Sequence, residues 1–167
     1  PFILSGSSLI RLEEVIEAKH DAWFQACLPG EAASIDALLD RAAAAGFGTL
    51  VVTVDVPVGG SRENLARAGF SSPLKPTPRL AWDGALRPRR IAEVMAPTLL
   101  RNGMPHFENS FAERGAPILS RNVERDFSAR DHFDWSHIAR IRARWRGSLV
   151  LKGVVRAEDV AAARAAG

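Results

Sequence analysis

The sequence Thr49-Leu50-Val51-Val52-Thr53-Val54-Asp55 decides the fold. It is rich in β-branched residues and almost entirely apolar, which is typical of a strand that is buried on both faces of a parallel sheet. Residues 31–45 precede it with the apolar spacing of an amphipathic helix, and Gly46 is placed to end that helix. A helix that leads directly into a buried strand predicts an α/β fold.

The same alternation extends outward from this strand in both directions. Further strands are predicted at residues 2–4, 22–27 and 149–153. Further helices are predicted over residues 9–19, with Ser8 as N-cap, over residues 134–146, and from residue 157 to residue 166. Short turns between alternating strands and helices indicate parallel strands joined by right-handed crossovers.

Two architectures fit this order of elements, an open doubly wound sheet and a TIM-type (β/α)8 barrel. No Gly-x-Gly-x-x-Gly follows any predicted strand, which disfavours a dinucleotide-binding sheet. Side chains that form hydrogen bonds or carry charge stand at the carboxyl end of each strand, namely Ser5, Gln25, Thr53 with Asp55, and Lys152. Barrel enzymes build their active sites at that end. Any one of these residues is explained equally well as the point where a buried strand reaches solvent. This explanation fits Lys152 less well.

We therefore predict that residues 1–167 form part of a single β/α barrel domain. About four of its eight strands are present, and residues 56–133 are predicted to be a long loop inserted between the third and fourth. Both ends of the chain are expected to be cuts through a larger fold. An isolated half barrel is expected to expose an open sheet edge and an apolar face.

Composition narrows the functional classes. The net charge of +3 is small, its basic part is concentrated in residues 56–133, and no aromatic-plus-basic motif accompanies it, so a nucleic-acid partner is not predicted. Cys27 is the only cysteine, which excludes an intrachain disulfide and favours a reducing, cytoplasmic compartment. No metal site is predicted, and no apolar run approaches the roughly 18–20 residues of a membrane-spanning helix.

Four motifs in register resemble the FMN-dependent α-hydroxy acid dehydrogenases, the family of L-lactate and mandelate dehydrogenases. Thr53-Val54-Asp55-Val56-Pro57, followed by Gly60-Ser61-Arg62-Glu63, is similar to the T-V-D-x-P…G-x-R-E motif of that family. Asp134-Trp135, Leu149-Val150-Leu151-Lys152-Gly153 and Ala157-Glu158-Asp159 resemble its W…L-V-K-G-I…P-E-D-A segment. Ser5-Gly6-Ser7-Ser8 with Glu13, and Trp23-Phe24-Gln25, follow the order of the family. Residues 83–105 look most like its mandelate and membrane-associated lactate dehydrogenase branch.

The resemblance implies a β/α barrel with FMN at its carboxyl face. It implies that Ser5, Gln25 and Thr53 bind the flavin ring by hydrogen bonds and that Lys152 lies beside flavin N1 and O2. A fixed cation there stabilises the negative charge of the reduced ring. Asp55 matches the carboxylate that pairs with the catalytic histidine of the family. The alternatives are that Asp55 is a turn acceptor and that Gln25 caps a strand end.

Residues that meet the substrate are implied by the same resemblance. Arg62 matches an arginine that reaches substrate and flavin, although an arginine in a polar loop is more often a solvated charge. Cys27 stands where the family carries a tyrosine that binds the substrate, and a thiol is a weaker and shorter donor. The S-N-H-G-G-R-Q segment, which supplies the catalytic His and Arg of the family, would follow beyond Gly167.

The predicted function is therefore FMN-dependent oxidation of an L-2-hydroxy acid, lactate-like or mandelate-like, to the 2-oxo acid by the complete protein. This chain alone is expected to be inactive. The alternative is a catalytically inactive flavin-binding or scaffold remnant, which the truncation and Cys27 motivate. A weaker alternative is a phosphate-binding barrel that acts on another substrate.

Residues 80–105 carry a further prediction. Ile91, Val94, Met95 and Leu99 share a helical face, and Arg87, Arg89, Arg90 and Arg101 flank it. This pattern is typical of a helix that lies in a membrane surface, and equally of a helix that covers a barrel mouth or an oligomer contact. The resemblance favours peripheral contact with the inner face of the cell membrane. It also implies a homo-oligomer, a tetramer.

Overall fold

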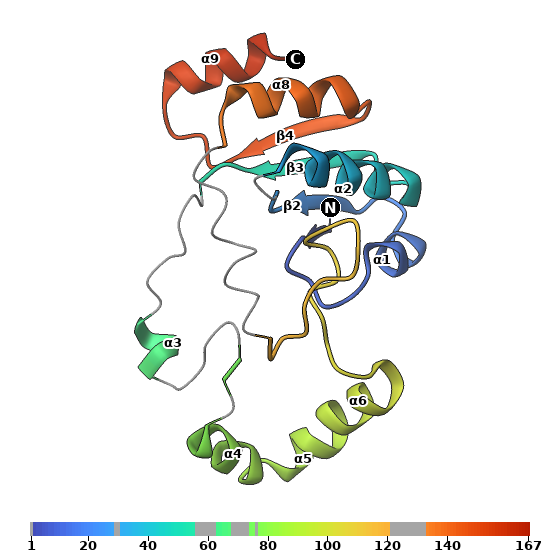
Figure 1. Cartoon of the computed structure of the whole chain (residues 1–167), viewed down its shortest axis with the longest axis vertical. Coiled ribbons are helices and arrows are strands. Elements are labelled where there is room, and N and C mark those ends of the chain that lie inside the picture. Colours follow the sequence, from blue (N-terminus) through green and yellow to red (C-terminus); the bar gives the residue numbers. More distant parts are fainter. Residues whose placement is uncertain (1, 29–30, 56–62, 68–73, 76, 121–132) are drawn as a thin grey trace.

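The computed structural model describes residues 2–28, 31–55, 63–67, 74–75, 77–120 and 133–167. Its sheet holds four parallel strands, β1 (Ile3–Ser5), β2 (Trp23–Ala26), β3 (Thr49–Thr53) and β4 (Ser148–Lys152), in the order β1-β2-β3-β4 (Figure 1). Each strand pairs with the next strand along the chain. A doubly wound sheet reverses its strand order at a switch point, whereas a barrel adds strands in sequence. The strand order therefore confirms the predicted α/β fold as part of a barrel.

Four helices accompany the strands: α1 (Leu12–Ala18), α2 (Ala32–Ala45), α8 (Trp135–Arg144) and α9 (Ala157–Ala165). Gly46 ends α2 as predicted, because its φ of 102° is left-handed and its N–H donates to the carbonyls of Ala42 and Ala43. Asp134 caps α8 by accepting hydrogen bonds from the N–H groups of Ser136 and His137.

The predicted start of the first helix was wrong. Ser8 does not cap it, since its hydroxyl accepts from the N–H of Ile10 at 3.1 Å while the residue before the helix is Arg11, which makes no side-chain cap. The N–H of Leu12 instead donates to Oδ1 of Asn109 at 2.9 Å. A residue distant in sequence therefore supplies the cap that local sequence does not.

The core lies between one face of the sheet and helices α1, α2 and α8. Phe24, Leu50 and Val52 of the sheet are fully buried in one cluster with apolar side chains of the three helices, among them Leu12 and Leu38. Burial of such a side chain contributes roughly 1.5–3 kcal/mol. Neighbouring residues of a strand point to opposite faces, so Val51, which is buried outside this cluster, lies on the second face.

The second face of the sheet is less covered, as a partial barrel predicts. Ile3 of β1 is 48% exposed and Val150 of β4 is 37% exposed. In a closed barrel this face is the packed interior. The central strand β3 is buried on both faces, as its apolar sequence predicts.

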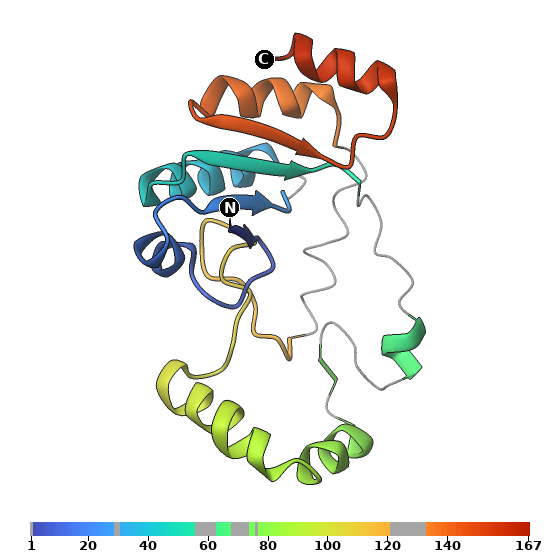
Figure 2. The same ribbon diagram turned by 180° about the vertical axis from the view of Figure 1, so that it is seen from behind.

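Residues 56–133 include helices, although this segment was predicted as a long loop. Its described part contains α3 (Glu63–Arg67), α4 (Pro78–Ala85), α5 (Pro88–Arg90), the π-helix η1 (Ile91–Met95) and α6 (Ala96–Asn102). Helices α4 to α6 lie away from the sheet in both views (Figures 1 and 2). The helical face predicted from Ile91 to Leu99 is confirmed as helical, and none of its residues is buried. Across the described ranges, no helix is long and apolar enough to span a membrane.

Candidate active site at the carboxyl ends of the strands

Polar side chains form a row across the carboxyl ends of the four strands. Ser5 of β1 pairs in register with Gln25 of β2, and Thr53 of β3 pairs with Lys152 of β4. The two pairs are joined because Nε2 of Gln25 donates to Oγ1 of Thr53 at 2.6 Å. The structure therefore brings together the four residues that the resemblance assigns to the flavin ring.

Gln25 is the centre of this row. Its half-buried amide donates a second hydrogen bond, from Nε2 to Sγ of Cys27 at 3.2 Å. A primary amide has two N–H donors, so these two contacts use both and fix the plane of the group. Cys27, the predicted substrate residue, lies beside the row.

Lys152 and Asp55 form the charged end of the row. Nζ of Lys152 lies 3.0 Å from one carboxylate oxygen of Asp55 and 3.3 Å from the other. Gly153, with a φ of 100°, makes this approach possible, because a Cβ at that position would lie 2.3 Å from the Cβ of Asp55. Both charged side chains remain partly exposed, at 52% and 37%, and so can meet a ligand. The structure pairs this carboxylate with a lysine of the same site.

The turn after β1 holds Ser5 at the other end of the row. Oγ of Ser5 accepts from the N–H of Ser7 at 3.2 Å, and the N–H of Gly6 donates to the carbonyl of Gln25 at 2.7 Å. A Cβ on Gly6 would lie 3.1 Å from both the Gln25 carbonyl and the Cys27 nitrogen. Glycine therefore lets the turn lie close against β2.

Sequence reasoning missed a buried polar run that contacts this turn. Glu108, Asn109 and Ser110 are 7%, 1% and 5% exposed, although they belong to the segment predicted as a loop. Asn109 accepts from the N–H of Leu12 and donates to the carbonyl of Ile10 at 2.7 Å. No periodicity marks these residues, so only the structure could identify them.

Other predicted features lie outside the row. Arg62 is outside the described residues, so its role stays a prediction. Among the described residues no group of three or more His, Cys, Asp or Glu side chains could hold a metal ion. His106 contacts the carbonyl of Met104, and His137 belongs to the cap of α8.

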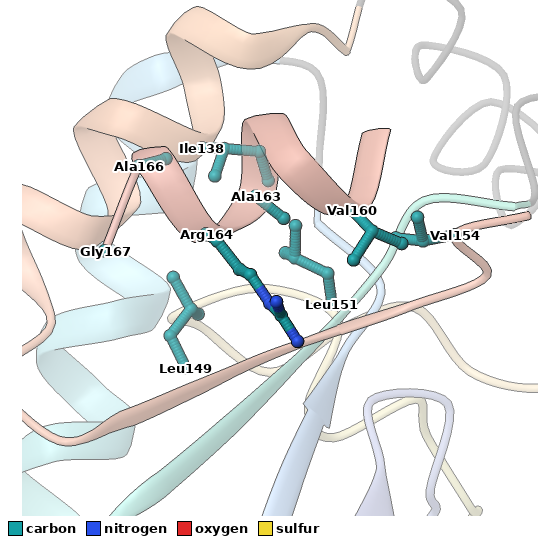
Figure 3. Close-up of a pocket in the computed structure, with 9 residues that line it drawn as sticks. All are labelled: Ile138, Leu149, Leu151, Val154, Val160, Ala163, Arg164, Ala166 and Gly167. Carbon is teal, nitrogen blue, oxygen red and sulfur yellow. The ribbon is translucent and has the colours of Figure 1, made fainter. Parts of the chain in front are cut away.

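An apolar cavity of about 360 Å³ lies on the helix side of β4. Figure 3 shows side chains of β4 and α9 around it, among them Leu149, Leu151 and Val160, with Arg164 as its charged lining residue. Leu149 and Leu151 alternate with the residues of β4 that share the face of Lys152, so this cavity is separate from the polar row.

Comparison with known proteins decides the family. A family model described as FMN-dependent dehydrogenase matches residues 1–167. The chain belongs to this family. It is 33% identical over 174 residues to an L-lactate dehydrogenase of Pectobacterium atrosepticum, and 35% identical over 176 residues to one of Caulobacter vibrioides. These matches cover 95% and 98% of the chain, but 41% and 42% of the two relatives.

Solved structures agree with the family. The monotopic membrane protein (S)-mandelate dehydrogenase matches with a TM-score of 0.77 and 28% identity, over 100% of this chain and 43% of that protein. The chain thus spans less than half the length of the relatives it matches. The cofactor of the family is FMN, and the polar row fits it, since a flavin ring edge needs hydrogen-bonding groups in a line and a cation where reduction places negative charge.

Proposed function

We propose that the complete protein oxidises an L-2-hydroxy acid to the 2-oxo acid with FMN, and that this chain supplies the residues that hold the flavin ring. The observation that carries the proposal is the continuous row Ser5, Gln25, Thr53 and Lys152 at successive strand ends. Bound FMN would supply the acceptor for the two electrons that leave the substrate.

Each residue of the row has a task that its chemistry allows. Ser5, Gln25 and Thr53 offer hydroxyl and amide groups to the polar edge of the ring. Lys152 offers a fixed cation, which stabilises negative charge more strongly in a closed site than in water. Gln25 aligns the row, since its amide plane is set by Thr53 and Cys27.

Asp55, Arg62 and Cys27 are assigned to the substrate side. Asp55 would orient the histidine that takes the substrate proton and favour its protonated form. Its ion pair with Lys152 would hold the carboxylate at the strand end until the histidine is in place. Arg62 would bind the substrate, and Cys27 would contact it in place of a tyrosine.

The substrate class is supported by the names of the relatives, which are L-lactate dehydrogenases and an (S)-mandelate dehydrogenase. The test is anaerobic mixing of the purified complete protein with L-lactate, (S)-mandelate and their mirror-image isomers. We expect a yellow protein whose flavin absorbance is bleached by an L or S acid and not by the opposite isomer.

Two other results would favour the alternatives. A protein that retains FMN but is bleached by none of these acids would be the inactive flavin-binding or scaffold protein that Cys27 motivates. A colourless protein that does not take up FMN would overturn the flavin assignment of the row.

We further propose that residues 80–105 attach the complete protein to the inner face of the cell membrane. Trp82, Leu86 and Leu100 are 65%, 63% and 86% exposed, so this segment presents several large apolar side chains outward. A monotopic membrane protein is among the similar structures. The proposal includes a cytoplasmic location and a homo-oligomer, a tetramer, whose subunits would each present this surface.

A further inference from the structure

The buried run Glu108–Ser110 lies against the backbone of the turn that follows β1. Every second carbonyl between Gly6 and Ile10, three in all, accepts a hydrogen bond from the run. Gly6 accepts from Oγ of Ser110 at 3.4 Å, Ser8 from the N–H of Glu108 at 3.2 Å, and Ile10 from Nδ2 of Asn109 at 2.7 Å. The conformation of the turn is therefore set by a segment about a hundred residues away.

Asn109 makes the shortest of these contacts. It is 1% exposed, and its amide bridges the end of the turn and the start of α1, donating to Ile10 and accepting from Leu12 at 2.9 Å. Helix α1 has no side-chain cap of its own, so Asn109 provides it. Loss of this amide would leave the buried N–H of Leu12 and the part-buried carbonyl of Ile10 without their partner, which costs more than loss of an exposed contact.

The run is itself held from α2. Nη1 of Arg41 donates to the carbonyl of Glu108 at 2.8 Å and to that of Phe111 at 3.1 Å. The same guanidinium binds both carboxylate oxygens of Glu13 on α1, at 2.8 and 2.9 Å. Arg41 therefore ties α1, α2 and the run into one unit behind the turn.

We propose that Asn109 is a positioning residue of the flavin site, acting through the turn that carries Ser5. The inference rests on the proposed function, because it assigns Ser5 to the flavin ring. The N–H of Ser7 donates to Oγ of Ser5 and so orients it. Ser7 directly follows Gly6, whose carbonyl accepts a hydrogen bond from the run. Asn109 is buried against the backbone of Ile10 and Leu12, so it would act without touching flavin or substrate.

The test uses the complete protein loaded with FMN and measures the FMN dissociation constant, the flavin reduction potential and thermal unfolding. Asn109→Ala should weaken FMN binding roughly 2- to 12-fold, the value of one net hydrogen bond. Ser5→Ala should have an effect of the same size. The double variant should bind FMN about as well as Ser5→Ala alone, because both substitutions remove one interaction.

Asp40→Asn is the matched control. It breaks the ion pair with Arg144 between α2 and α8 and touches neither the turn nor the run. It should lower thermal stability and leave the FMN dissociation constant unchanged. Asn109→Asp keeps an acceptor for Leu12 and removes the donor to Ile10, so FMN affinity should fall between those of the native protein and Asn109→Ala. It answers the same question if Asn109→Ala does not fold.

Three results would overturn the inference. In the first, Asn109→Ala lowers the unfolding temperature but changes neither FMN affinity nor potential, so its role is purely structural. In the second, the effects of Asn109→Ala and Ser5→Ala add fully, so Asn109 does not act through Ser5. In the third, the native protein binds no FMN, and this result alone also removes the proposed function.

Discussion

The strand–helix unit and the helices α4 to α6 use apolar residues in opposite ways. Phe24 and Leu12 of the first region are fully buried, whereas Trp82 and Leu100 of the second are 65% and 86% exposed. Both regions show apolar residues at helical spacing in the sequence. Periodicity therefore specifies which face of a helix is apolar, but the surface that covers this face depends on the rest of the fold.

Charges differ between the regions in the same way. Arg140 of α8 binds Asp36 of α2 at 2.6 Å. This pair joins two helices that residues 56–133 separate in the sequence. In α5, Arg89 pairs only with Glu93, one turn further along the same stretch of helix, and within the described structure Arg87 and Arg90 form no salt bridge. In the first region, ion pairs join α2 to α8, whereas in the second Arg87 and Arg90 point outward without such a pair in the described structure. This is the arrangement that binding to an anionic surface requires.

The largest expected effect tests whether flavin reduction depends on the strand–helix unit. Lys152→Met in the complete protein should slow flavin reduction by the hydroxy acid roughly 10²–10³-fold, since it removes the cation that stabilises the reduced ring. Stopped-flow absorbance of the flavin measures this rate. Lys152→Arg is the control that keeps the charge, and it should retain part of the rate. Normal reduction in Lys152→Met would remove the flavin assignment of the strand ends.

The next effect tests the outward surface of the second region. Replacement of Arg87, Arg89 and Arg90 by Gln should weaken sedimentation with anionic liposomes at low salt. Each basic residue near such a surface contributes about 1 kcal/mol. Arg89 should contribute least, because Glu93 already neutralises it. High salt should reduce the difference between the variant and the native protein.

A control on α8 and the residues just after it separates location from net charge. Replacement of Arg140, Arg144 and Arg146 by Gln removes the same charge from the first region and should leave liposome binding unchanged. Equal loss of binding in both triple variants would mean that net charge alone controls attachment. Absence of binding by the native protein would leave α4 to α6 as a lid or an oligomer contact.

A single glycine tests how closely the polar row is packed. Gly153→Ala places a Cβ 2.3 Å from that of Asp55 at a φ of 100°, so either the strand end or Asp55 must shift. We expect a loss of roughly 1–3 kcal/mol in stability, together with slower flavin reduction. Gly48→Ala, where nothing lies within 4 Å of the added atom, is the matched control. Equal behaviour of the two variants would show that Asp55 and Gly153 are not held together in solution.

Much of the strand–helix unit could be predicted because its signals are local. The apolar run of β3, the glycine that ends α2 and the polar strand ends each follow from neighbouring residues. Adjacent parallel strands bring together carboxyl ends that lie far apart in sequence. Thr53 and Lys152 could therefore be predicted as neighbours from sequence alone.

Contacts between distant residues could not be predicted in this way. Ser8 looked like a helix cap because it precedes an apolar periodic stretch, yet Asn109 takes that role from about a hundred residues away. Burial of Glu108, Asn109 and Ser110 depends on the fold of the insertion, which has no pattern of its own at that point. Local sequence marked the polar strand ends as candidate site residues, and it missed the distant contacts that hold them.

Cys27 gives a smaller effect at the border between flavin row and substrate. Cys27→Tyr should raise turnover of a small hydroxy acid, since a phenol donates a stronger hydrogen bond than a thiol, worth roughly 0.5–1.5 kcal/mol net. The substitution also removes the sulfur that accepts from Gln25 at 3.2 Å. Steady-state turnover and FMN affinity should be measured together, because a change in the orientation of the Gln25 amide would change FMN affinity. Unchanged or lower turnover would identify the cysteine as an adaptation.

The smallest effect concerns the ion pairs that join α2 to α8. Hydrogen bonds from Arg140 lower the pKa of Asp36, and those from Arg144 lower the pKa of Asp40, below the usual 3.8. A carboxylate with a lowered folded-state pKa stabilises the protein above its unfolded value and loses this contribution as pH falls through the folded value. The pairs should therefore act fully at neutral pH and fail in acid, below about 3.8.

Asp36→Asn with Asp40→Asn tests this dependence by thermal unfolding of the complete protein across pH. The variant should be slightly less stable at neutral pH, and its difference from the native protein should shrink as pH falls below 4 or as salt rises. Glu14→Gln with Glu17→Gln removes the same charge from exposed residues of α1 that form no salt bridge in the described structure, and should not follow that pH pattern. A stability difference that stays constant into acid would mean that the pairs seen between α2 and α8 contribute nothing measurable. The packing of α2 against α8 would then rest on the apolar core, and the contrast with α4 to α6 would rest on what covers each apolar face.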